Sequence, residues 1–179
     1  MRALINKAAA IAAFSHRTQE RKQGGPYIAH PAAVGIILAR HGFSDEVVAA
    51  GLTHDVLEDT DFPMDQFRAE LGDQVFAIVQ AVTYDPLLSR EEKRTKYVQT
   101  VRTANEEVKA VSIADKIANA TDLLLTAEKE GRKVWGYFNH GRDKKLEQEE
   151  VLLAMFKETW QHPLVMEYEN LVIRIRALD

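Results

Sequence analysis

The sequence predicts an all-α fold, a compact bundle of helices. Apolar residues recur at intervals of three and four along nearly the whole chain of 179 residues, which is the spacing of one face of an α-helix. No segment sustains the alternation that is typical of a β-strand, and only 5 prolines interrupt the helical pattern. The length fits one domain, residues 1–179, and allows a substantial core.

The first two helices are separated by a glycine-containing loop. An amphipathic helix is expected over about residues 4–19, and the polar loop ERKQGGPY, residues 20–27, follows it. Pro31 suits the first turn of the next helix, which places His30 at or next to the N-cap.

Capping residues mark the starts of the next elements. Ser44 can cap a helix that continues through GLTHDVLEDT, residues 51–60. A short helix that opens at Asp61 and Pro63 should end at Gly72, and another should follow to about residue 83. Ser89, with Glu92 three positions later, has the pattern of a capping box and predicts a further helix start.

The second half of the chain contains the longest apolar helix. It should begin at Asn105, and Gly131 should break it. Residues 132–141 form the least predictable segment. Two final helices, over about residues 142–160 and 163–178, close the expected domain.

Composition excludes several classes of protein. The net charge of −4 and the isoelectric point of about 5.9 disfavour binding to a nucleic-acid polymer, although a small anionic ligand needs only a local basic pocket. The absence of cysteine excludes thiolate metal sites and disulfides, and it suits a cytoplasmic protein. No apolar run reaches about 18 residues, so no membrane span is expected.

Four titratable groups crowd into the stretch that begins at His54. On a continuous helix His54 and Glu58 would share one line of the surface, and Asp55 and Asp59 would share the adjacent line. One interpretation is a solvated acidic face. The presence of an imidazole next to a carboxylate favours another, a site where both converge on a divalent ion.

Two further residues would complete such a site. His30 could project into a cleft from a helix start, or it could be a simple capping or surface histidine. Asp115 lies within an apolar helix and needs a partner, either a metal or the neighbouring Lys116. Together His30, His54, Asp55 and Asp115 offer two nitrogen and two oxygen ligands. This set favours one six-coordinate ion such as Mn²⁺, with about two positions left for water and substrate.

Three motifs carry a resemblance to a known family. They are HRTQERKQGGPYIAHP (16–31), AAGLTHDVLEDT (49–60) and VSIADKIANATDL (111–123). The order His, His-Asp, Asp is the signature of the HD superfamily of metal-dependent phosphohydrolases. The three blocks resemble those of the hydrolase domain of Rel/Spo-type enzymes, and the length resembles that of the stand-alone small alarmone hydrolases.

The resemblance implies an HD-domain fold and an activity. The expected reaction is hydrolysis of guanosine tetra- or pentaphosphate (ppGpp or pppGpp) at the 3′ position, which gives pyrophosphate and GDP or GTP with Mn²⁺ as cofactor. By matching positions the metal ligands would be His30, His54, Asp55 and Asp115. The catalytic pair would be Glu58 and Asp59, and the nucleotide pocket would include Arg21, Lys22 and Asn119.

The sequence departs from the family at one position and leaves alternatives open. Thr121 stands where the family often has an arginine, so a basic contact to the substrate is expected to be missing at this position. Basic residues such as Arg94, Lys144 and Lys145 could rim the site or simply be solvated. The alternative functions are an HD phosphohydrolase acting on a nucleoside monophosphate or NADPH, and a non-catalytic alarmone-binding module. A homo-oligomer is compatible with the sequence but is not predicted by it.

Overall fold

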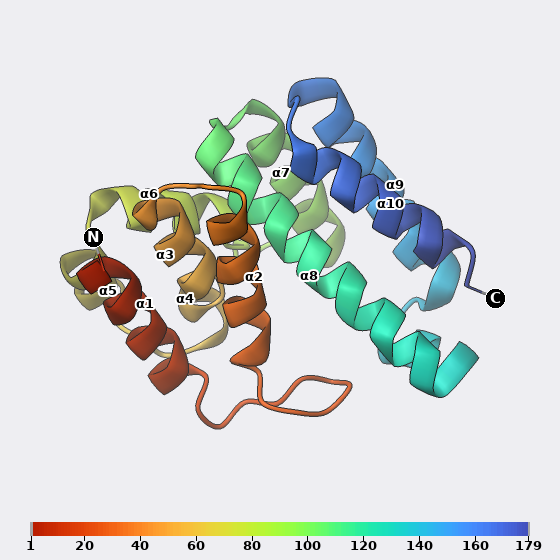
Figure 1. The fold of residues 1–179 in the computed structure, drawn as a ribbon, viewed down its shortest axis with the longest axis horizontal. Helices are drawn as coiled ribbons and strands as arrows, with labels where there is room; N and C mark the ends of the chain where they lie inside the picture. The colour runs from red at the N-terminus through yellow and green to blue at the C-terminus, as the bar shows by residue number, and fades with distance from the viewer. Residues whose placement is uncertain (1, 179) are drawn as a thin grey trace.

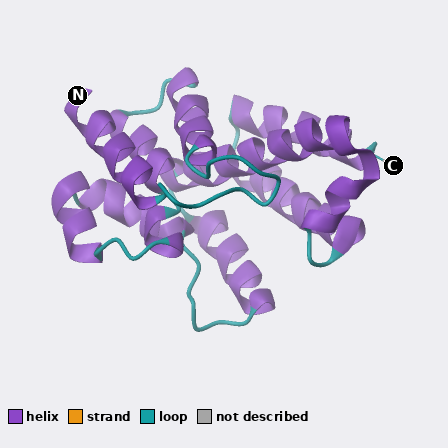
Figure 2. Cartoon of the chain, turned by 90° about the horizontal axis from the view of Figure 1, so that it is seen from below, coloured by secondary structure: helices purple, strands orange, loops and turns teal. Residues whose placement is uncertain are grey.

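The protein is a bundle of helices, as Figures 1 and 2 show. The structure, a computed structural model, describes residues 2–178, and no strand occurs among them. One isolated β-bridge between Glu20 and Pro26 closes the glycine loop. The predicted all-α fold is therefore confirmed. No helix within the described part of the chain is both long enough and apolar enough to cross a membrane.

The elements follow one another through short connections. In chain order they are α1 (Arg2–Ser15), α2 (Ala29–Arg40), α3 (Asp45–Thr53), α4 (Val56–Asp59), α5 (Met64–Leu71), α6 (Asp73–Val82), α7 (Arg90–Thr103), α8 (Glu106–Glu130), the 3₁₀ helix η1 (Gly131–Tyr137), α9 (Gly141–Thr159) and α10 (Pro163–Arg176).

Helix α8 is the axis of the bundle. It packs against α2, α3, α6, α10 and η1. Figure 1 shows α8 running from the N-terminal group of helices to the pair α9 and α10, with the two chain ends at opposite sides of the molecule. Ile113, Ala114 and Ile117 on α8 are buried in the core. A polar side chain between Ile113 and Ile117 therefore lies among buried residues or in a cleft between neighbouring helices.

Two glycines allow α2 and α3 to pack closely. A Cβ atom at Gly51 would overlap the side chain of Leu38, and one at Gly35 would lie 2.7 Å from the Cγ of Leu52. Glycine at both positions removes these clashes, so the two backbones can approach. This contact holds the start of α2, which carries His30, against the end of α3, which precedes His54.

Most of the predicted helix ends are confirmed. The side chains of Ser44 and Asn105 accept hydrogen bonds from the amides of Val47 and Val108. Ser89 and Glu92 form the predicted capping box. Gly131 ends α8 with a φ of 58°, a conformation that favours glycine.

The first helix ends earlier than predicted. Helix α1 stops at Ser15, and residues 16–18 form turns instead of continuing to residue 19. The side chain of Arg17 donates to the carbonyl of Phe14 at 2.7 Å, and the amide of Arg17 contacts the same carbonyl. These local contacts satisfy the carbonyl of Phe14, which would accept a backbone hydrogen bond if α1 were longer. The chain can therefore turn into the glycine loop.

The predicted continuous helix through residues 51–60 is wrong. Helix α3 ends at Thr53, His54 and Asp55 form a turn, and α4 begins at Val56. The Nδ1 atom of His54 lies 2.8 Å from the carbonyl oxygen of Gly51, an acceptor that a continuous helix would give to the amide of Asp55. A side chain therefore takes the place of the backbone at the point where the helix breaks.

Candidate metal centre and active site

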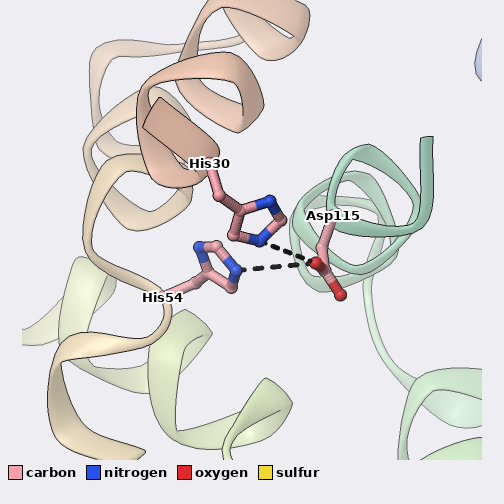
Figure 3. Close-up of side chains that lie close together, drawn as sticks. All are labelled: His30, His54 and Asp115. Atoms are coloured by element: carbon pink, nitrogen blue, oxygen red, sulfur yellow. Dashed lines mark ion pairs between the residues drawn. The ribbon is translucent and has the colours of Figure 1, made fainter. Parts of the chain in front are cut away.

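Two histidines and an aspartate from distant parts of the chain converge on one point. His30 comes from the first turn of α2, His54 from the turn after α3, and Asp115 from the middle of α8. The Oδ1 atom of Asp115 lies 3.1 Å from Nε2 of His30 and 3.7 Å from Nε2 of His54. Figure 3 shows both rings turned toward this carboxylate. One ligand atom from each of the three residues lies within 4.8 Å of the other two.

Asp55 borders the same point from the other side. Its Oδ2 atom lies 3.2 Å from Nε2 of His54 and 3.7 Å from Nε2 of His30. His54 and Asp55 are adjacent in sequence and keep right-handed helical backbone angles, and both side chains reach this point. Of the four side chains that the sequence indicated as candidate ligands, His30, His54 and Asp115 form the group with ligand atoms within 4.8 Å of one another, and Asp55 lies next to both histidines.

The protonation pattern of His54 fits a cation. The carbonyl of Gly51 can only accept, so Nδ1 of His54 carries the proton and the neutral ring has its lone pair on Nε2. This Nε2 atom is buried, and it has no hydrogen-bond partner among residues 2–178. In the neutral ring this lone pair faces two carboxylates, and a divalent ion bound in place of a proton would satisfy every group.

The local charges favour a cation as well. Burial acts to lower the pKa of His54, but Asp55 and Asp115 outweigh it and raise this pKa to about 9. Burial also opposes ionisation of Asp115, yet Lys116 and the two imidazoles hold the pKa of its carboxyl well below its usual range. The centre therefore attracts positive charge, either protons or a metal ion.

Asp115 has both of the partners that the sequence left open. The ammonium of Lys116 lies 2.6 Å from its Oδ2 atom, whereas Oδ1 faces the imidazoles. The amide of Asn119, one turn later on α8, also donates to Oδ1 at 2.5 Å. Lys116 and Asn119 therefore fix the direction of the carboxylate and leave it aimed at the centre.

Glu58 and Asp59 lie next to the centre but are held differently. Glu58 lines a small cleft of about 50 Å³ together with His54, Asp55 and Asp115. Its Oε2 atom accepts a hydrogen bond from the amide of Tyr84 at 2.9 Å. Burial, followed by the repulsion of nearby carboxylates, raises the pKa of both Glu58 and Asp59.

Tyr27 is a site residue that the sequence reasoning missed. Its hydroxyl donates to Oδ2 of Asp55 at 2.7 Å and lies 3.1 Å from Oδ2 of Asp59. Burial and these two carboxylates raise the pKa of Tyr27, so the phenol keeps its proton. The available signal was its place in the motif GGPYIAHP, three residues before His30.

The glycine loop places Arg21 against α8. Gly24 and Gly25 have φ values of 90° and 87°, and the amide of Arg21 donates to the carbonyl of Gly25 at 2.9 Å. In this tight loop the guanidinium of Arg21 reaches Oδ1 of Asn119 at 3.0 Å and Oδ2 of Asp122 at 2.7 Å. The structure therefore joins Arg21 and Asn119, two of the three expected nucleotide contacts.

Lys22 lies apart from that contact. Its side chain is exposed, and it has no hydrogen bond or ion pair with any residue from 2 to 178. Thr121, where the family often has an arginine, donates its hydroxyl to the carbonyl of Ile117 at 2.8 Å. The side chain of Thr121 is therefore engaged with its own helix.

A much larger cavity adjoins the metal cleft. Its volume is about 970 Å³, and it lies between α7, α8 and α9. Tyr84, Tyr97 and Lys116 line both hollows, and Asn119 lines the larger one. A ligand of nucleotide size could thus extend from the cleft into the cavity.

Comparison with known proteins identifies the family. Residues 8–140, most of the chain, match the HD domain. The chain therefore belongs to the HD-domain family.

Relatives and solved structures narrow the relationship. The chain is 40% identical over 125 residues to the mouse guanosine-3′,5′-bis(diphosphate) 3′-pyrophosphohydrolase MESH1, and the match covers 68% of this chain and 70% of the relative. Its fold is similar to that of the metazoan SpoT ortholog described as hydrolysing ppGpp, with a TM-score of 0.83, 26% identity and coverage of 99% and 97% of the two chains. The crystal structure of lmo0812 from Listeria monocytogenes EGD-e is also similar, with a TM-score of 0.75, 35% identity and coverage of 85% and 98%. These relationships confirm the expected resemblance to the stand-alone alarmone hydrolases within the HD hydrolases.

Proposed function

We propose that the chain hydrolyses the 3′-pyrophosphate of guanosine tetra- and pentaphosphate and releases pyrophosphate with GDP or GTP. The observation that carries the proposal is the convergence of His30, His54, Asp55 and Asp115 beside the carboxylate of Glu58. The relatives whose names state this activity support the choice of substrate.

The centre fits one divalent ion, and we propose Mn²⁺. Two imidazole nitrogens and two carboxylate oxygens form a ligand set that suits a six-coordinate ion, and the chain has no cysteine that would favour a thiolate site. When bound, such an ion supplies Lewis acidity, which polarises a phosphoryl oxygen and acidifies water.

Glu58 is the proposed acceptor of the proton from the attacking water. Glu58 lines the cleft, and the amide of Tyr84 donates to its Oε2 atom and not to Oε1. A raised pKa makes this carboxylate a better base than an exposed one. Asp59 is the second carboxylate of the proposed catalytic pair. The hydroxyl of Tyr27 donates to its Oδ2 atom and holds it beside the centre.

The remaining proposed residues bind the nucleotide. Asn119 presents an amide beside the centre, and Arg21, fixed by Asp122, presents a guanidinium that can stack on a purine or form a fork with a phosphate. Lys22, in the same loop as Arg21, has an exposed side chain that can reach toward a phosphate of the nucleotide. We also propose that residues 1–179 form one domain and that the protein acts in the cytoplasm.

Product analysis tests this proposal. Purified chain is loaded with Mn²⁺ and offered guanosine tetraphosphate, a panel of nucleoside monophosphates and NADPH, with a chelator control for each. We expect release of pyrophosphate from the tetraphosphate, and we expect the chelator to stop it. Release of orthophosphate from the tetraphosphate, or faster turnover of NADPH or a monophosphate, would reject the proposed substrate.

A further inference from the structure

The large cavity beside the metal cleft is positively charged, although the whole chain is acidic. The net charge of the chain is −4. Against three carboxylates, those of Glu91, Glu147 and Glu149, the cavity wall carries six cations: Arg90, Arg94, Arg102, Lys116, Lys144 and Lys145. Four of the six are in ion pairs: Arg102 with Glu158, Lys116 with Asp115, Lys144 with Glu147 and Lys145 with Glu149. Such a local excess of cations in a concave site concentrates anions. The occupant should therefore be a polyanion or an anionic part of a larger ligand.

Lys145 on α9 is a cation that its surroundings hold in place. Its ammonium donates to Oε1 of Glu149, one turn later, and lies 5.3 Å from the centre of the Phe138 ring. Glu149 is 3% exposed, and the hydroxyl of Tyr168 on α10 donates to its Oε2 atom at 2.5 Å. Ordering a lysine in advance removes much of the entropy cost of binding an anion. The lysine is thus prepared for a ligand that enters the cavity.

Helix α7 supplies cations from another wall of the cavity. Arg94 is half-buried, and Arg90 lies one turn before it on the same helix. Neither guanidinium forms an ion pair with any residue from 2 to 178. Lys116 lines both this cavity and the metal cleft. Cations therefore extend from the metal centre into the cavity.

We propose that this cavity binds the 5′-diphosphate of the nucleotide and that Lys145 is the residue that selects for it. The inference rests on the proposed function, which puts the 3′-pyrophosphate in the metal cleft. Both phosphate arms leave the same ribose, so the 5′ arm must lie in a hollow that adjoins the cleft. A purine is uncharged and does not need a wall of cations, whereas a diphosphate does.

Paired substitutions can remove the cation and keep the fold. Lys145→Met alone would leave the buried carboxylate of Glu149 without its ion-pair partner, which is destabilising. The double variant Lys145→Met with Glu149→Gln removes both charges at nearly constant volume. Its matched control is Lys157→Met with Glu169→Gln, because this pair also links Lys to Glu (2.6 Å), involves the same helix and does not line the cavity.

Two readouts test the selection. Calorimetry measures the affinity for GDP, and kinetics measures kcat/KM for guanosine 3′-diphosphate with either a 5′-diphosphate or a 5′-hydroxyl. We expect the Lys145/Glu149 variant to bind GDP about 10- to 100-fold more weakly than wild type and to lose a similar factor in its preference for the 5′-diphosphate. The control pair should keep both values. The preference is the ratio of the two kcat/KM values, and both values are measured on one preparation. Any unfolded fraction lowers both values by the same factor, so it does not change the ratio.

The outcomes separate this inference from the proposed function. Unchanged GDP affinity and unchanged preference in the Lys145/Glu149 variant would overturn the role of Lys145, even if wild type releases pyrophosphate. Conversely, GDP binding that depends on Lys145 in a chain that does not hydrolyse guanosine tetraphosphate would support the anion site and reject the proposed function.

Discussion

At the scale of single residues, Asp115 performs two tasks with one carboxylate. Its Oδ1 atom faces the two imidazoles, and its Oδ2 atom is paired with Lys116. The lysine keeps the group ionised in a buried position and also lines the cleft. A carboxylate in the middle of an apolar helix is thereby made stable and available to a metal ion.

The carboxylates of Glu58 and Asp59 can be tested by isosteric change. In the double variant Glu58→Gln with Asp59→Asn we expect kcat to fall by about 10²- to 10⁴-fold, because the water loses its proton acceptor. Affinity for Mn²⁺ should be largely kept, since the four candidate ligands are unchanged. Steady-state kinetics and metal titration measure the two effects. Turnover equal to that of wild type, or to that of the exposed control Glu128→Gln, would refute the roles given to this pair.

The hydroxyl of Tyr27 links a candidate ligand to the catalytic pair. Tyr27→Phe removes the hydrogen bonds to Asp55 and Asp59 and keeps the ring beside His16, whose centre lies 4.8 Å away. We expect kcat/KM to fall by about 10-fold and the affinity for Mn²⁺ to weaken, as is usual when the group that orients a ligand is lost. Unchanged kinetics together with unchanged metal affinity would show that Tyr27 only fills space.

At the scale of elements, the segment that joins α3 to α4 positions the site. His54 and Asp55 keep right-handed helical backbone angles there, so their directions differ by about 100°, as on a helix. Even so, Oδ2 of Asp55 comes within 3.2 Å of Nε2 of His54. The two adjacent side chains can therefore reach the same point, and Glu58 follows within one turn of α4.

The close contact of α2 and α3 at Gly51 is a testable cause of this geometry. We expect Gly51→Ala to lower the free energy of unfolding by about 1–3 kcal/mol, because the new Cβ would overlap Leu38. It should also weaken Mn²⁺ binding, since His30 lies on α2 and His54 directly follows α3, the two helices that would move apart. Chemical denaturation and metal titration measure both effects.

Gly136→Ala is the control for that prediction. A Cβ atom at Gly136 meets nothing within 4 Å, and this glycine does not have a positive φ. The control should therefore keep both the stability and the metal affinity of wild type. If Gly51→Ala behaves like Gly136→Ala, the close packing does not set the position of the histidines.

Local chemistry explains which features the sequence could predict. Caps at Ser44, Ser89 and Asn105 depend on neighbours three residues away, so they are visible in the sequence. The turn at His54 depends on a side chain that bonds to the carbonyl of Gly51, and helix periodicity alone does not reveal this. The hydrogen bonds of Tyr27 reach 28 and 32 positions along the chain, which needs the fold itself.

At the scale of the whole molecule, α8 connects two regions with different tasks. Its middle supplies Asp115 and Asn119 to the centre, where α2 and the α3–α4 turn meet it. Lys116, on the same helix, also faces the cavity that α7 and α9 enclose. Figure 1 shows this helix passing from one group of helices to the other. The bundle thus places a reaction centre and a basic cavity side by side.

A bound ion should stabilise the whole bundle, because its ligands come from three separate segments. At a concentration of Mn²⁺ about 100 times its dissociation constant, we expect the folded state to gain about 2.7 kcal/mol. Thermal unfolding followed by calorimetry should show Tm rising with Mn²⁺ in wild type. The rise should be absent in His54→Gln and Asp115→Asn. An equal rise in these variants would place the stabilising ion elsewhere.

Anomalous scattering from crystals grown with Mn²⁺ tests the central claim most directly. The account predicts a manganese peak at bonding distance from Nε2 of His30, Nε2 of His54, Oδ2 of Asp55 and Oδ1 of Asp115. A map without a peak at this point at saturating Mn²⁺, with the four side chains turned away from one another, would contradict it.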